Sequence, residues 1–555
     1  MPVLRPLLRA TAPWLAAAAC AARLHGQPGP LRPALGTVRD SASRRPLPGA
    51  VVLLLDSLGR TVSRATTDEA GRYRVPVSAD ARRMRVLRLG FRPQERPLAV
   101  EAPGEFALVP IPMLLTSVRV AAAASCPARA DRGAAFALLE QVRAGLLATV
   151  VARAQRPARM TRLLYERRFD GGGDRIAHQS VSLSFANAAD RSFGAARSGA
   201  AFVAQGFLDQ ATNTYFGPDP ETLIDEGFAA GYCFQLATPD RGRPGQVGLE
   251  FAAARPRDGR IDIAGALWVD TVARSLGDLE FRYVGLDRRV AALSPGGRLS
   301  FRDLANGITV IDRWSMRLVS GELAAGADGP FSRSTSRLHV TEVGGELATA
   351  AWPNGYAWSA PLGTLRLHTV THDGRSAAGT VVRLDDTDYE ATADSAGVAE
   401  IPHLLPGPYA VSIADPRLAA LGVPLATPLR FVAERDSVAT RRLEVATAED
   451  FTAARCLSDR SRTKTADTSG TGWLLGRVST PDGRAADGAR WTIRDREGSL
   501  LVEGGRVGGD GLFHWCRLAR GTPIVVEASQ GGRRATARAY LEERLTIVPL
   551  VLRDP

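Results

Sequence analysis

A repeated pattern of glycine and aspartate constrains this chain of 555 residues more than any other feature. In each copy a glycine opens an extended run, and about 35 residues later an aspartate and a glycine form a turn into another run. The opening glycines are Gly36, Gly363 and Gly476, and the turn pairs are Asp68 with Gly71, Asp394 with Gly397, and Asp510 with Gly511. Because other sequence separates the copies, they predict three homologous small β-domains and not a solenoid.

The chain is too long for one hydrophobic core, so we expect several domains. The fold class that we predict is mainly β, with three β-sandwich modules and a central antiparallel sheet that carries one long helix. The predicted boundaries are a signal peptide at 1–26, a first sandwich at 33–115, a central domain at 126–350, a second sandwich at 361–445, a linker at 446–470 and a third sandwich at 471–555. The linker is inferred from its polar, Ser/Thr-rich composition.

The N-terminus has the pattern of an export signal. Arg5 and Arg9 precede a short, almost entirely small or apolar stretch that ends near Ala22, and Gly26 lies near a suitable cleavage site. Cys20 within this stretch offers the alternative of a lipoprotein anchor, although its preceding alanines depart from the usual signal. No later stretch reaches 18 apolar residues, so we expect no transmembrane segment in the mature chain. The expected location is the periplasm or the cell surface.

Four cysteines remain after the signal: Cys126, Cys233, Cys456 and Cys516. An even number of cysteines in an exported chain indicates disulfides, and three pairings are possible. Order along the chain favours Cys126 with Cys233 and Cys456 with Cys516, since each pair then stays within one region. No CxxC or Cys/His cluster supports a metal site instead.

The positive charge is spread along the chain. The formal net charge is +12, and Lys464 is the sole lysine, so arginine supplies nearly all of the positive charge. The densest cluster runs from Arg82 to Arg96, and a solvated face explains it better than a site for an anionic partner. No nucleic-acid-binding motif accompanies it, so we expect no nucleic-acid partner.

The region from 126 to 350 combines one helix with many strands. Leu138, Val142, Leu146 and Val150 recur every four residues, which predicts a helix over 127–155 with one apolar stripe. From about residue 158 onward, alternating segments predict long antiparallel strands. These strands suggest a wide, curved sheet, with a half-barrel as one form of it, that closes around a core or a groove.

The first repeat resembles the carboxypeptidase regulatory-like family through Gly36, Val38, Pro46, Gly49, Ala50, Asp68, Gly71 and Tyr73. The second copy keeps Gly363, Asp394, Gly397 and the turn Pro406–Tyr409, but lacks the Pro-Gly-Ala turn. The third keeps Gly476, Gly488, Ala489, Asp510, Gly511 and Phe513. The resemblance implies transthyretin-like sandwiches of about seven strands and an exported location, and it implies no catalysis. The central region is similar, in architecture alone, to the half-barrel of periplasmic lipoprotein carriers.

The sequence carries mimics of catalytic motifs without their context. His339 and Glu342 have the spacing of a zinc pair, but they lie on an alternating strand and would point to opposite faces. His368 and His372 lack the glutamate of a helical zinc motif. Neither a G-x-S-x-G elbow nor a P-loop occurs. Acidic pairs such as Asp385 and Asp386 fit solvated turns, so we expect no catalytic residues, metal or cofactor.

Aromatic residues concentrate in the central region and at its end: Trp268, Tyr283, Trp314, Trp352, Tyr356 and Trp358. We expect most of them in the core, with Trp352, Tyr356 and Trp358 the best candidates for an exposed binding surface. Together these features predict a non-catalytic exported binding or scaffolding protein whose partner is another envelope protein. The alternatives are a carbohydrate-binding protein that uses the aromatic surface, and a lipid or lipoprotein carrier that uses the central domain.

Overall fold

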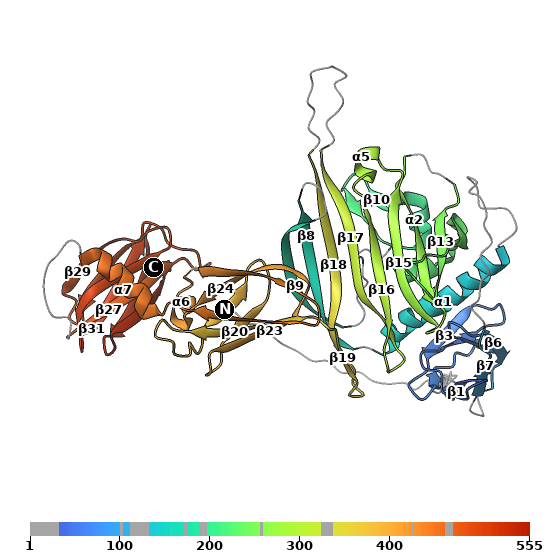
Figure 1. The fold of residues 1–555 in the computed structure, drawn as a ribbon. Helices are drawn as coiled ribbons and strands as arrows, with labels where there is room; N and C mark the ends of the chain where they lie inside the picture. The colour runs from blue at the N-terminus through green and yellow to red at the C-terminus, as the bar shows by residue number, and fades with distance from the viewer. Residues whose placement is uncertain are drawn as a thin grey trace, which may run out of the picture.

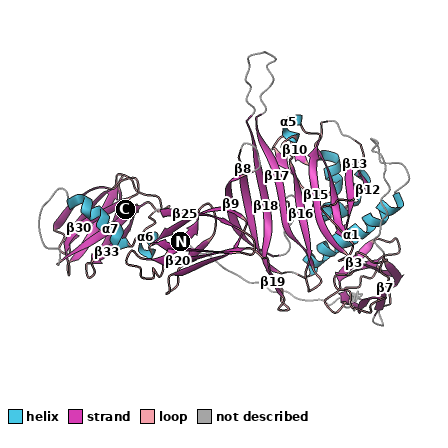
Figure 2. Cartoon of the chain, viewed as in Figure 1, coloured by secondary structure: helices cyan, strands magenta, loops and turns pink. Residues whose placement is uncertain are grey.

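The structure is a computed structural model, and it is mostly β, with 52% strand and 13% helix. It describes residues 33–99, 104–111, 132–156, 158–170, 175–187, 193, 197–255, 259–322, 337–423, 426–460 and 470–554. The predicted signal peptide, Cys20 and Cys126 lie outside these residues. Figures 1 and 2 show a central sheet with the first module beside helix α1 at one side, and the second and third modules in a row at the other.

The three repeats fold into sandwiches of identical topology, each with a three-stranded and a four-stranded sheet. In each module the first strand pairs antiparallel with the fourth and parallel with the last. The strands of the first module are β1 Ala34–Asp40, β2 Val51–Leu55, β3 Thr61–Thr66, β4 Arg72–Val75, β5 Arg83–Leu87, β6 Gln94–Pro97 and β7 Gly104–Leu108. Those of the second are β20 Gly363–Val370, β21 Val381–Leu384, β22 Glu390–Thr392, β23 Val398–Leu404, β24 Gly407–Ala414, β25 Ala426–Ala433 and β26 Val438–Glu444. Those of the third are β27 Thr471–Ser479, β28 Arg490–Asp495, β29 Leu500–Arg506, β30 Leu512–Ala519, β31 Pro523–Gln530, β32 Arg533–Tyr540 and β33 Leu545–Val551.

The turn glycines keep their identity because a backbone carbonyl leaves no room for a side chain. Gly71, Gly397 and Gly511 have φ values of 70°, 75° and 72°. A Cβ on any of them would lie 2.5 or 2.6 Å from a carbonyl oxygen of the module's first strand. The same glycine carbonyl accepts the N–H of that strand at 2.7–2.8 Å in all three modules. The turn therefore clamps the first strand, and only glycine fits it.

The aspartates of the turns have different positions in the three modules. Asp68 and Asp394 each accept two main-chain N–H groups within their own turn. In the third module Gly508 occupies the equivalent place, because the N–H of Gly511 donates to its carbonyl. The carboxylate of Asp510 instead accepts the N–H of Leu512 and lies 3.7 Å from Arg455. The repeated acid is thus a local support for the turn and is not required at one fixed position.

The second module lacks the Pro-Gly-Ala sequence of this turn but keeps a glycine at the equivalent position. Gly379, with φ of 76°, donates its N–H to Ala393, as Gly49 does to Thr67 and Gly488 does to Val507. The turn therefore forms without the proline found at Pro48 in the first module.

The central domain is built on one ten-stranded antiparallel sheet with the order β12-β13-β14-β15-β16-β17-β18-β8-β9, with β19 paired to β18. Its strands are β8 Arg159–Phe169, β9 Ile176–Asn187, β12 Tyr232–Leu236, β13 Gln246–Ala253, β14 Asp262–Asp270, β15 Ser275–Val284, β16 Gly296–Asp303, β17 Thr309–Glu322, β18 Arg337–Ala351 and β19 Ala357–Ser359. The remaining elements are α1 Arg132–Gln155, α2 Gly199–Gln205, β10 Leu208–Asp209, β11 Thr214–Tyr215, α3 Pro220–Ile224, α4 Glu226–Gly231 and α5 Arg288–Ala291. Helices α1 to α4 cover one face of the sheet. The hydrophobic core between them and the sheet includes the fully buried Phe202, Phe207 and Phe228.

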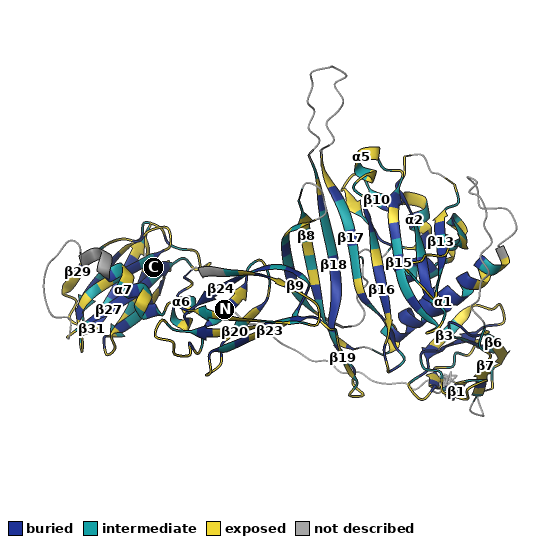
Figure 3. Ribbon diagram, viewed as in Figure 1, coloured by how far each residue is buried: buried dark blue, intermediate teal, exposed yellow. Residues whose placement is uncertain are grey.

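Helix α1 is buried on two sides (Figure 3). Leu138, Val142 and Leu146 belong to the core of the central sheet, while Ala148 and Val151 contact the first module. By length and composition α1 could cross a membrane, but 61% of its most apolar window is buried within the protein. This burial is typical of a core helix.

Strand β2 is buried on both faces because it joins two cores. Val52 and Leu54 point into the sandwich, whereas Val51, Leu53 and Leu55 contact α1. The side chain of Gln141 on α1 bridges the two domains, accepting from the N–H of Gly90 at 2.8 Å. The apolar run of β2 is continuous because one face of the strand lies in the sandwich core and the other contacts helix α1 of the neighbouring domain.

The second module shares a core with the other face of the central sheet. Leu163, Val181 and Ala348 of the sheet pack in one cluster with the module's own core residues. Strand β9 ends the sheet, and a turn of the second module covers its edge, since the N–H of Asp388 donates to the carbonyl of Val181 at 3.0 Å. This contact protects a long edge strand.

The segment that we predicted as a linker, 446–470, is in part a packed helix. Helix α7, Ala448–Arg460, buries Ala448 and Cys456 with Leu418 of α6, Pro416–Ala420, and with Trp473 of the third module. Polar composition misled the prediction because the contact needs only a few apolar side chains within an otherwise polar segment. A disulfide joins Cys456 to Cys516 on β30.

One carboxylate of the central sheet is buried in a β-bulge. Asp312 is the extra residue of β17 where the register with β16 shifts, and it is 5% exposed. Burial raises its pKa above the ordinary value of 3.8, although Arg302, 2.7 Å away, opposes this. Its other carboxylate oxygen, Oδ1, is buried without a hydrogen-bond partner.

We predict that replacing both cysteines of the Cys456–Cys516 disulfide with alanine lowers the free energy of unfolding by about 2–4 kcal/mol, because the bond closes a long loop of the unfolded chain. Denaturant unfolding of the full chain measures this, and hydrogen exchange should report earlier opening of α7. The single variant Cys516→Ala should match the double variant. Equal stability of the double variant and the parent would contradict a stabilising role.

We also predict that Asp312→Asn raises the free energy of unfolding at pH 7 by about 1.4 kcal/mol for each unit by which the pKa of Asp312 in the folded protein exceeds its value in the unfolded chain. Because the folded state holds this proton more tightly than the unfolded chain, the group stabilises the fold below its ordinary pKa and loses that contribution as pH rises. The gain from the variant should therefore shrink toward pH 4. Thermal melts of both proteins across this range test it, and a gain that grows on acidification would refute the assignment.

Candidate functional site

A groove of about 760 Å³ lies where the second module meets the face of the central sheet opposite its helices. We call it the interdomain groove. Its sheet side is lined by Tyr165, Arg167, Ile176, Arg298, Ser300, Arg313, Trp314, Ser315, Glu342, Gly345 and Glu346. Its module side is lined by Pro406, Gly407, Val432, Ala433, Glu434 and Arg435. The volume is typical of ligand-binding clefts, and two domains contribute walls.

Arg167 on β8 holds one end of the groove together. Its guanidinium donates to Gln179 at 2.6 Å, to Glu342 at 3.1 Å and to the carbonyl of Pro406 in the second module at 2.9 Å. It also lies 4.3 Å from the ring centre of Tyr165. Because these contacts occupy its guanidinium group, Arg167 has a structural role: it fixes the position of the second module against the sheet.

Glu346 on β18 and Arg435 after β25 form a second bridge between the domains. The two terminal guanidinium nitrogens of Arg435 each donate to one carboxylate oxygen of Glu346 at 2.6 Å, and the side chain of Glu346 is 7% exposed. The hydrogen bonds that Arg435 donates to Glu346 raise the pKa of Arg435 further above its ordinary value, against the opposing effect of burial. A bidentate pair of this kind fixes orientation as well as distance.

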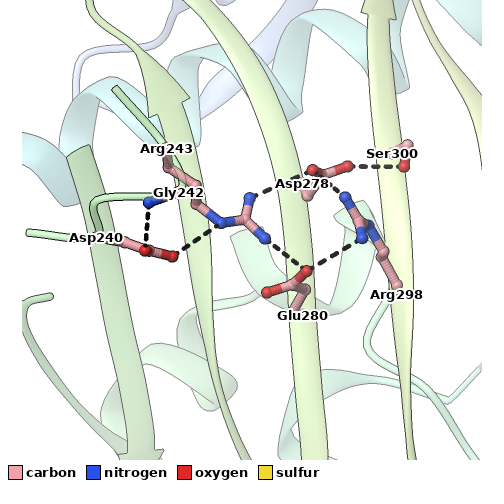
Figure 4. A network of polar contacts seen from close by, with 7 residues as sticks. All are labelled: Asp240, Gly242, Arg243, Asp278, Glu280, Arg298 and Ser300. Atoms are coloured by element: carbon pink, nitrogen blue, oxygen red, sulfur yellow. Dashed lines mark hydrogen bonds and ion pairs between the residues drawn. The ribbon is translucent and has the colours of Figure 1, made fainter. Parts of the chain in front are cut away.

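A charge network continues from the groove across the open face of the sheet (Figure 4). Arg243 contacts Asp278 at 3.3 Å and Glu280 at 2.6 Å, and Arg298 contacts the same two carboxylates from the other side. Burial raises the pKa of Asp278, but hydrogen bonds from Arg298 and Ser300 outweigh it, so the net pKa lies below the ordinary value. Asp240 also lies 3.6 Å from Arg243, so three carboxylates outnumber the two guanidinium groups and the network carries a small net negative charge.

Two charged groups of the groove form no direct pair. Arg313 on β17 and Glu434 after β25 are both exposed, and neither side chain forms an ion pair or hydrogen bond with any described residue. The groove therefore offers one cation on the sheet side and one anion on the module side, next to apolar surface from Val432. The ring of Trp314 points to the other face of the sheet, where it packs against Phe193.

The aromatic residues that we proposed as an exposed surface lie elsewhere. Trp352 is 7% exposed and packs in a cluster beneath the end of α1, with Tyr356 and Trp358 partly buried against it. The expectation of an exposed aromatic row was wrong for Trp352, because the turn after β18 folds back onto the sheet. The N–H of Trp352 bonds to the carbonyl of Tyr356 at 2.9 Å in this turn.

The other candidate residues from the sequence have structural roles or lie outside the described part of the chain. The turn residues Asp68, Gly71, Asp394, Gly397, Asp510 and Gly511 support their modules, and none of them lines the groove. Cys233 is disulfide-bonded, and its proposed partner Cys126 falls outside the described part of the chain. In the ranges that the structure describes, no group of three or more His, Cys, Asp or Glu side chains is placed to hold a metal ion.

Sequence reasoning missed the groove because its residues come from distant strands. Arg167, Arg313, Glu342 and Arg435 meet only after the sheet forms and the second module docks on it. The available signal was weak: in β16 to β18 charged residues recur four positions apart with Ser or Gly between them, which indicates one polar face but not what lies against it.

Comparisons with known proteins identify one part of the chain. Residues 35–111 match the family model of the carboxypeptidase regulatory-like domain. No curated protein matches the sequence. Among solved structures, the chain is similar to the Bacillus anthracis TIE protein at 10% identity and a TM-score of 0.15, covering 69% of this chain and 80% of that one.

Two further similarities are to pilins. The minor pilin GBS52 of Streptococcus agalactiae has 11% identity and a TM-score of 0.13, covering 35% of this chain and 97% of that one. A mutant form of the shaft pilin SpaA of Lactobacillus rhamnosus GG has 10% identity and the same TM-score, covering 35% and 98%. Such low scores carry no conclusion about fold or activity. What the comparisons establish is that residues 35–111 form a carboxypeptidase regulatory-like domain, which fits a non-catalytic binding or scaffolding protein.

Proposed function

We propose that this protein is a non-catalytic binding scaffold of the cell envelope, and that it holds another envelope protein in the interdomain groove. The observation that carries this proposal is the groove itself, whose two walls belong to different domains and are fixed in place by Arg167 and by the Glu346–Arg435 pair. A preformed site of this kind binds without the full entropic cost of ordering its walls.

The way the domains are joined supports a scaffold. Each junction has an apolar cluster that includes residues from both neighbours: β2 with α1, the central sheet with the second module, and the second module with α7 and the third module. Shared cores resist independent movement of the domains. The chain can therefore present the groove in a fixed orientation relative to its ends.

The two alternative functions have less support. A glycan site would use Trp352, Tyr356 and Trp358, but Trp352 is buried and the other two are partly buried. A lipid carrier would use space between the central sheet and its helices, and that space is packed by Phe202, Phe207, Phe228 and their neighbours. Export to the envelope remains part of the proposal, on the strength of the N-terminal sequence.

We predict that a photocrosslinking residue in place of Ser315, on the floor of the groove, captures one or two recurrent proteins in the native cells. The matched control places the same residue at Val272, which is 85% exposed in the turn between β14 and β15, away from the groove. Mass spectrometry identifies the products. Recurrent capture at 315 but not at 272 supports the proposal; the same products at both positions, or none at 315, would refute it.

A further inference from the structure

Strand β25 has an open edge, whereas its counterparts in the other two modules do not. In the third module, Arg534 of β32 exchanges two main-chain hydrogen bonds with Arg553 after the last strand, at 2.9 and 3.0 Å. In the first module, the N–H of Arg92 before β6 donates to Val109, and Gln94 and Arg96 reach carbonyls of β7. No hydrogen bond among the described residues joins β25 to β26. Among three modules of the same topology, β25 of the second module is therefore the edge strand that is not bonded to the module's last strand.

The orientation of the β25 main chain can be read from its neighbour. The carbonyl of Ala410 on β24 accepts the N–H of Asp385 at 2.9 Å, so the main-chain groups of Ala410 point away from β25. Its antiparallel partner Arg430 must then point its own N–H and C=O toward the open edge. The same alternation applies to Val432, which lies opposite Pro408, a residue without an N–H.

This open edge borders the interdomain groove. Val432 is 66% exposed and lines the groove together with Ala433 and Glu434. Such an exposed apolar side chain on a free edge strand is normally protected, as the edge of β9 is by the turn containing Asp388. The unprotected edge therefore has the form of a pairing site.

The two charges without a direct pair constrain the occupant. Arg313 on the sheet wall favours a bound molecule with an acidic group beside it, and Glu434, directly after β25, favours a basic group. Val432 provides apolar contact beside them. A strand presents alternate side chains to opposite sides, so one extended segment can bond to β25 through its backbone and contact the sheet wall through its side chains.

We propose that the groove binds an extended segment of a partner protein, which adds to β25 as a further strand and carries an acidic side chain against Arg313 and a basic one against Glu434. This inference rests on the proposed function, because it names the mode in which the same groove takes its partner. Backbone pairing supplies the affinity, and the charges set the register.

The test uses the full chain and random linear peptides displayed on phage, selected for binding to it. Selected peptides should carry both an acidic and a basic residue, and hydrogen exchange should show protection of the amides of Arg430 and Val432 on binding. Val432→Pro removes one outward N–H and should weaken binding at least about tenfold, while the control Val432→Thr keeps that N–H and should bind normally. Proline is tolerated at such a position because the lost N–H does not pair within the sheet.

A charge exchange makes the test independent of the proline variant. Arg313→Glu should weaken binding about tenfold, and replacing the acidic residue of the peptide with lysine should restore it. Failure to select peptides, or equal binding to the parent, Val432→Pro and Arg313→Glu, would overturn strand addition. If Ser315 still captures a recurrent partner in that case, the groove retains its proposed function and only the binding mode is wrong. Circular dichroism melts of each variant confirm that it is folded.

Discussion

The structure depends on apolar surfaces that are buried from two sides at once. Helix α1 packs its one side on the central sheet and its other on the first module, and β2 does the same between its own sandwich and α1. The central sheet continues the arrangement, since helices cover one face while Leu163, Val181 and Ala348 on the other join the core of the second module. Removing apolar surface from water is the main favourable contribution to such contacts.

This arrangement explains why the polar surface is concentrated where it is. The sheet face that carries the groove is only partly covered, so the strands beyond the second module expose charged side chains. There arginines and carboxylates neutralise one another, as Arg243, Asp278, Glu280 and Arg298 do. Polar pairs at the junction have a second role, because Arg167 and Arg435 reach across it and fix the angle between the domains. A groove with fixed walls is the product of both effects.

The repetition of one sandwich gives three copies of a fold in three settings. The first copy packs one face of β2 against α1. The second copy lies between the central sheet and the third module, and the third copy is linked to α7 by a disulfide. The edge strand that the other copies close is left open in the second, next to the groove. Divergence among copies is thus found at edges and outer faces, while the clamping turns stay the same, since any side chain at Gly71, Gly397 or Gly511 would meet a carbonyl oxygen.

Elements with a strong local signal could be predicted from the amino-acid sequence. Glycine spacing identified the sandwiches, a four-residue apolar period located α1, and alternation indicated the long strands of the central domain. The sequence did not reveal α7, because its few apolar residues lie in a polar stretch. It also did not reveal the burial of Trp352, because a turn residue is buried only when the chain folds back over it. The groove emerged only from the assembled domains, since Arg167, Arg313 and Arg435 are far apart along the chain. Local patterns specify which residues face a core, but the packing of one domain on another decides which polar residues meet.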